Sequence, residues 1–159
     1  MSHLDLGGLG VDVPDGWEAE LGWAGGSIPP SGGVPDPDGP GPRVVAHLAN
    51  FMLPPGRGDY GSGAVELMDS GAIFISIMEF ERSARAPSLF SGTGVPSRIH
   101  GADFSPDQLQ RRLPGQAGLQ RFFTVGDRRF VLYVVIGSYR MRDVLAPEVA
   151  RLLGAISFT

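Results

Sequence analysis

The stretch that decides the fold is QAGLQRFFTVGDRRFVLYVVIG, residues 116–137, in which two apolar runs flank a Gly-Asp pair. Both runs are rich in aromatic and β-branched residues, a composition that favours β-strands. Gly126-Asp127 is a favoured two-residue hairpin connection, because glycine adopts the positive φ of a type II′ turn. We therefore predict a β-hairpin made of residues 117–125 and 128–137.

A two-residue loop fixes the register of this hairpin, because each strand then pairs outward from the turn. The cross-strand pairs predicted on its two faces are Phe123–Phe130, Arg121–Leu132 and Leu119–Val134, and Phe122–Val131 and Gln120–Tyr133. The second strand is apolar at every position from 130 to 136, so both of its faces must be buried. A buried helix is the competing interpretation, and the β-branched content favours the strand.

The rest of the chain supplies further strands and short helices. Residues 72–81 (AIFISIMEFE) are a second strand that is apolar on both faces. Pro-Asp-Gly at 14–16 predicts a turn between two strands. Ser105-Pro106 is a typical helix start, with a capping serine and a proline in the first position. The other predicted elements are strands at 9–13, 17–21, 43–53 and 156–158, and helices at 62–69, 105–112 and 143–153.

These elements predict a single α+β domain spanning residues 1–159, with a largely antiparallel sheet sandwiched by short helices in an α/β/α arrangement. The length of 159 residues is enough for one well-buried core. Residues 24–42 are dominated by Gly and Pro and cannot form a core, so we expect a flexible loop or a partner-binding arm there.

Composition excludes several classes of chemistry. The chain has no cysteine, which excludes disulfides, thiolate catalysis and cysteine metal sites. All 13 basic residues are arginine, which excludes Schiff-base and P-loop lysine chemistry. No apolar run reaches the length of a membrane-spanning helix, and the N-terminal residues lack the pattern of a secretory signal. We therefore expect a cytoplasmic protein.

Charge is distributed unevenly along the chain. The net charge of −4 combines seven acids and no arginine in residues 1–42, giving −7, with 13 arginines and ten acids in residues 43–159, giving +3. Such a basic lobe could attract an acidic protein partner, or it could lie against the acidic N-terminal part. The residues that we expect to contact a partner are Arg111, Arg112, Arg121, Arg128, Arg129, Arg140 and Arg142.

Catalytic and cofactor motifs are not evident. The histidines at 3, 47 and 100 have no metal-ligand spacing, and the sequence has neither a G-x-S-x-G motif nor a complete dinucleotide fingerprint. Glu79 and Glu81 share a strand face, but Glu81 with Arg82 and Arg85 fits a solvated strand end better than a glycosidase pair. Arginines near aromatic residues could bind a single-stranded nucleic acid, which the net negative charge makes the weaker interpretation. We expect no cofactor and no metal.

The pattern resembles the PsbP-like superfamily. The matching stretches are VPDGW at 13–17, GAIFISIMEF at 71–80, QRFFTVGDRRFVLYVVIGS at 120–138 and LLGAISF at 152–158. The superfamily includes the extrinsic photosystem II subunit, the nuclear Ran-release factor, LpqN/LpqT-type lipoproteins and chaperones of secreted bacterial toxins. The resemblance implies an antiparallel sheet sandwiched by helices and a function as an adaptor, assembly factor or chaperone. It transfers no site residue.

The sequence thus favours a non-enzymatic protein-binding module of bacterial type. A small-molecule-binding or enzymatic domain is the alternative, with a pocket between sheet and helices in which His47, Glu79 or His100 would converge. A homo-oligomer that forms through an open sheet edge is the third possibility.

Overall fold

The computed structural model describes residues 2–24, 43–81, 90 and 92–159. The loop expected at 24–42 lies outside the described residues except for Ala24. Nine strands form two sheets in the described part, and they are accompanied by one α-helix and several short 3₁₀ turns. The α+β class with a mainly antiparallel sheet is therefore confirmed.

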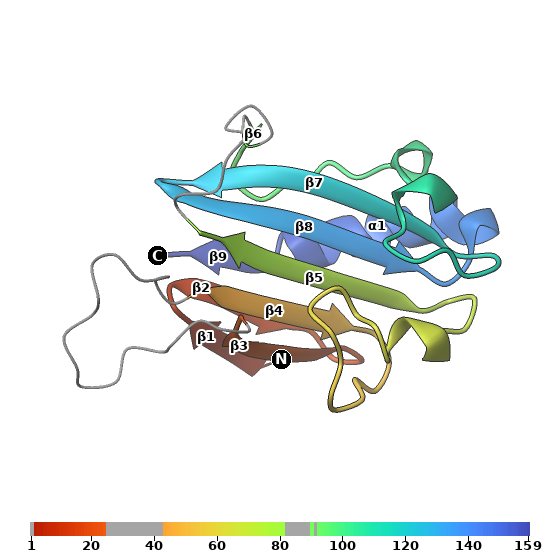
Figure 1. The fold of residues 1–159 in the computed structure, drawn as a ribbon, viewed down its shortest axis with the longest axis horizontal. Helices are drawn as coiled ribbons and strands as arrows, with labels where there is room; N and C mark the ends of the chain where they lie inside the picture. The colour runs from red at the N-terminus through yellow and green to blue at the C-terminus, as the bar shows by residue number, and fades with distance from the viewer. Residues whose placement is uncertain (1, 25–42, 82–89, 91) are drawn as a thin grey trace.

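The larger sheet has six strands in the order β3-β4-β5-β8-β7-β6 (Figure 1). All neighbouring strands are antiparallel except β6 and β7. Their bounds are β3 Glu18–Trp23, β4 Val44–Ala49, β5 Ile73–Phe80, β6 Gly92–Thr93, β7 Ala117–Val125 and β8 Arg128–Ile136. The two strands predicted to be buried on both faces, β5 and β8, pair with each other near the middle of the sheet.

The central hairpin has the predicted register. Phe123 lies opposite Phe130, Phe122 opposite Val131 and Gln120 opposite Tyr133. Gly126 has a φ of 62°, as the turn requires. The rings of Phe123 and Phe130 stack at a centroid distance of 5.3 Å, and this pair anchors the turn end of the hairpin in the core.

One face of the six-stranded sheet is covered by helix α1 (Arg142–Leu153) and by a three-stranded sheet, which lie behind it in Figure 1. The small sheet has the order β1-β2-β9, with β1 at Ser2–Leu6, β2 at Leu9–Val13 and β9 at Ile156–Phe158. Its side chains and those of α1 form the main core with β5 and β8.

The N-terminal hairpin was not predicted. Strands β1 and β2 are joined by Gly7-Gly8, whose φ angles of 58° and 84° suit a tight two-residue turn. Strands at 9–13 and near 17–21 were predicted and are present, but they do not pair with each other. They belong to different sheets, since β2 pairs with β1 and β9 while β3 pairs with β4.

The opposite face of the large sheet is covered by loops rather than by α-helices. The helices predicted at 62–69 and 105–112 are 3₁₀ turns at Val65–Leu67 and Pro106–Gln108. Gly63 has a φ of 94°, which is incompatible with a helix beginning at Ser62. Leu109 has an extended ψ of 137° and does not continue a helix. It packs with Leu113 against a smaller core cluster that includes Phe74, Tyr133 and Val135.

The C-terminal helix begins one residue before its predicted start at 143 and ends at Leu153 as predicted. Helix α1 contains Pro147 in its first half and buries Leu145, Ala146, Val149, Leu152 and Leu153. The chain then forms the predicted final strand β9. No helix in the described ranges is long and apolar enough to cross a membrane.

We expect Phe130→Ala to lower the free energy of unfolding by about 3–5 kcal/mol, because it leaves a cavity beside Phe123 in the main core. Urea denaturation monitored by circular dichroism measures this change. The control is Val144→Ala on α1, whose side chain is 69% exposed, and we expect it to change stability by less than about 0.5 kcal/mol. Equal effects of the two variants would contradict the assigned core.

Candidate functional site

Arg128 is bound inside the fold. Its Nε and one terminal nitrogen contact the two carboxylate oxygens of Glu79 at 2.8 and 2.9 Å, and its other terminal nitrogen donates to the Gly7 carbonyl at 2.8 Å. Glu79 also accepts a hydrogen bond from the Val44 amide at 3.2 Å. The hydrogen bonds that Arg128 donates to Glu79 raise the pKa of Arg128 above its ordinary value. The pair therefore joins the N-terminal hairpin to the edge of the main core.

The other six arginines predicted to contact a partner are in three different environments. Arg111, Arg112 and Arg121 form ion pairs with Glu66, Asp107 and Asp103 respectively. Arg129 lies over the Phe90 ring at 5.5 Å, and Arg142 lies over Tyr139 at 4.2 Å. Arg140 is exposed and forms no ion pair within the described residues. Most of these arginines are thus not neutralised by the acidic residues of the N-terminal strands.

A row of polar side chains crosses the loop-covered face of the large sheet. Strand pairing places His47 opposite Ser76, Ser76 opposite Tyr133, and Tyr133 opposite Gln120, with Glu20 at the other end of the row. The Tyr133 hydroxyl accepts a hydrogen bond from the Gln110 amide at 2.8 Å. This row was not recognised in the sequence, because its members are contributed one by each strand and meet only through the register.

His47 has a hydrogen bond on each ring nitrogen. Arg57 Nε donates to Nδ1 at 2.9 Å, so Nε2 carries the proton and donates to the Asp59 carbonyl at 2.9 Å. Arg57 also binds Glu20 at 3.1 Å, and its side chain is only 6% exposed. Burial is the main cause of the lowered pKa of His47, and the nearby Arg57 adds to it. The neutral His47 imidazole thus connects the loop at 54–59 to the sheet. Arg57 and Asp59 of the Arg57-Gly58-Asp59 tripeptide therefore have a structural role in this loop.

The three residues proposed for an enzymatic pocket are not brought together. His47 lies on the loop-covered face, whereas Glu79 lies on the opposite face and pairs with Arg128. His100 is in the segment that precedes the 3₁₀ turn Gly101–Asp103. Glu81 follows β5 and lies 3.9 Å from Arg43. Among the described residues, no group of three His, Asp or Glu side chains is arranged to hold a metal ion.

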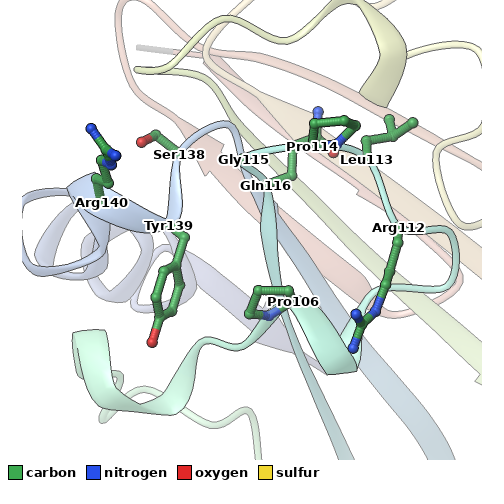
Figure 2. Close-up of a pocket in the computed structure, with 9 residues that line it drawn as sticks. All are labelled: Pro106, Arg112, Leu113, Pro114, Gly115, Gln116, Ser138, Tyr139 and Arg140. Atoms are coloured by element: carbon green, nitrogen blue, oxygen red, sulfur yellow. The ribbon is translucent and has the colours of Figure 1, made fainter.

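A concave pocket of about 500 Å³ lies between the 106–116 segment and the turn that precedes α1. Figure 2 shows Arg112 and Arg140 on opposite sides of it, with Pro106 and Tyr139 between them. Its wall also includes Leu113, Pro114, Gly115, Gln116 and Ser138. We call this pocket the arginine cup.

Local geometry holds the arginine cup in shape. The Tyr139 amide donates to the Gly115 carbonyl at 2.7 Å, which ties the two walls together. The guanidinium of Arg142 stacks on the Tyr139 ring and donates to the Tyr139 carbonyl at 3.0 Å. Gln116 Nε2 donates to the Val65 carbonyl at 2.7 Å, whereas its buried Oε1 has no hydrogen-bond partner in the described structure. These contacts hold the turn bearing Tyr139 and Arg140 in place as one wall of the arginine cup.

The arginine cup suits an anionic group attached to an apolar one. Arg140 forms no ion pair with a carboxylate in the described part of the chain, so it can offer charge-assisted hydrogen bonds to a ligand, whereas Arg112 on the other side of the cup is paired with Asp107. Tyr139, Leu113 and two prolines provide apolar surface beside them. The sequence identified Arg112 and Arg140 as candidates, but it gave no signal for Tyr139 or Pro106, which reach the cup from separate segments.

No protein-family model matches the sequence, and no similar protein was found among the curated proteins or among the solved structures.

We expect Arg128→Met to lower the free energy of unfolding by about 3 kcal/mol, because it leaves the Glu79 carboxylate buried without its cation. The double variant Glu79→Met/Arg128→Met should recover part of this loss, since the unpaired charge is then gone. Urea denaturation of both variants, with Arg140→Met as the exposed control, measures the effect. A double variant less stable than Arg128→Met would contradict this explanation.

We expect the protein to lose stability as the pH falls below 6.5, the ordinary pKa of histidine. The pKa of His47 is lowered in the folded state, so the unfolded chain takes up this proton first and acid favours unfolding. Urea denaturation at several pH values between about 5 and 8 gives the slope. His47→Gln should flatten the slope, and Val144→Ala, an exposed substitution that leaves every histidine in place, should retain it. The same slope in both variants would refute the role of His47.

Proposed function

We propose that this protein is a non-enzymatic protein-binding module, an adaptor, assembly factor or chaperone of bacterial type, and that the arginine cup binds an acidic segment of its partner. The observation that carries the proposal is the cup itself, a concavity of about 500 Å³ with arginines on both sides of an apolar floor. Interfaces are enriched in arginine and tyrosine because both combine contact area with directed hydrogen bonds.

Two further features support a binding role. His47 and Glu79 are side chains of types that often perform catalysis. Both are hydrogen-bonded within the fold, and they lie on opposite faces of the sheet. The resemblance to the PsbP-like superfamily belongs to the same proposal, because its members are mostly adaptors, assembly factors or chaperones. The cytoplasmic location expected from the sequence remains a prediction.

A small anionic molecule is the second candidate ligand. A volume of about 500 Å³ lies within the range of small-ligand pockets. The cup is assembled from two surface segments and holds no buried pair of titratable groups, which favours a docked peptide segment over a substrate undergoing chemistry.

The proposal predicts that peptides selected from a random displayed library will carry aspartate or glutamate next to an apolar residue. Arg140→Glu should bind the selected peptides at least about tenfold more weakly, because it replaces an unpaired cation with an anion at the rim. Isothermal titration calorimetry measures the affinities. A partner captured from host lysate should be lost with the same variant.

Arg98→Glu is the matched control, since Arg98 is exposed and does not line the cup. It changes net charge equally and should leave the affinity unchanged. Selected peptides without acidic residues, or peptides that bind Arg140→Glu as well as the native protein, would refute the proposal. Binding of small carboxylates or phosphates in place of peptides would favour the second candidate.

A further inference from the structure

Strand β3 forms one rim of the six-stranded sheet (Figure 1). It pairs with β4 along its whole length, from Glu18 opposite Ala49 to Trp23 opposite Val44. No described strand pairs with its other edge. An edge of this kind presents unpaired backbone groups that can accept another strand.

The hydrogen-bonding pattern shows which groups are free. Ala24 donates its amide to the Arg43 carbonyl at 2.6 Å, which marks this pair as a hydrogen-bonded one. Hydrogen-bonded pairs recur at every second residue of an antiparallel ladder, so Gly22, Glu20 and Glu18 bond toward β4. The amides and carbonyls of Ala19, Leu21 and Trp23 therefore point outward, and no described group bonds to them.

A groove of about 370 Å³ runs beside the first half of this edge. Its wall combines Ala19 of β3 with Leu4 of β1 and with Leu53. Leu4 is one of the few large apolar side chains that remain exposed, at 36%. The edge thus has both unpaired backbone groups and apolar surface on which a side chain could rest.

The charge around the groove is negative. Residues 2–24 contain no arginine or lysine, and their five acids are Asp5, Asp12, Asp15, Glu18 and Glu20. Arg57, the cation that pairs with Glu20, has an almost fully buried side chain. Antiparallel pairing of two copies of β3 would bring their glutamates close together, and like charges on neighbouring strands destabilise a sheet. This charge disfavours a second copy and favours a basic partner.

We propose that the outer edge of β3 binds an extended, basic segment of another protein by adding it as a seventh strand of the large sheet. The backbone groups of Ala19, Leu21 and Trp23 supply the hydrogen bonds, and Glu18 and Glu20, the two acids that line the groove, select for arginine or lysine. This surface is separate from the arginine cup and does not depend on it.

The experiment uses two hexapeptide probes, (Arg-Val)₃ and (Glu-Val)₃, titrated into the ¹⁵N-labelled full chain. We expect (Arg-Val)₃ to shift the amide signals of residues 19, 21 and 23 and to bind more weakly as salt is added. Leu21→Pro removes an outward amide without removing a bond to β4, so it should weaken binding about tenfold. Leu21→Ala keeps the amide and should bind like the native protein.

Ala19→Pro provides the same test at a second position if Leu21→Pro fails to fold. The proposal is overturned if neither peptide shifts these signals, if the proline variants bind like the native protein, or if (Glu-Val)₃ binds as well as (Arg-Val)₃. It is also overturned if light scattering shows that two copies associate and that Leu21→Pro separates them, because the edge then binds itself.

Discussion

The structure depends on one constraint, which is that β5 and β8 are apolar on both faces and pair side by side. A sheet of this kind needs a cover on each side, because every exposed apolar face costs free energy in water. The chain supplies two different covers. Helix α1 and the three-stranded sheet close one face, and the loops at 50–72 and 105–116 close the other. The positions of most other residues follow from this requirement.

Polar groups are tolerated inside these covers because they are paired. Glu79 and Arg128 satisfy each other where the N-terminal hairpin meets the large sheet, and their pairing offsets the cost of burying the two charges. His47 and Ser76 both bond to the Asp59 carbonyl and hold the covering loop in register. The buried hydrogen-bonding groups of Glu79, Arg128, His47 and Ser76 thus serve the fold.

Two surfaces outside the covered core are the ones that we propose for binding. The arginine cup forms where the loop at 106–116 meets the start of α1, and the β3 edge remains open because the small sheet packs beneath the large one without extending it. The cup is basic and the edge is acidic. Together, the two proposed surfaces would let the chain hold two partners of opposite charge at once, as we expect of the proposed adaptor.

The sequence by itself determined the central hairpin and its register, the buried strand β5, helix α1 and the mixed class of the fold, because each depends on apolar pattern and turn chemistry within one short segment. It also identified Arg112 and Arg140 as candidates for contacting a partner. Only the tertiary structure decided that 9–13 and 17–21 lie in different sheets, that Arg128 is taken by Glu79, and that Tyr139 faces the cup. These facts depend on contacts between residues far apart in the chain, which local pattern does not encode.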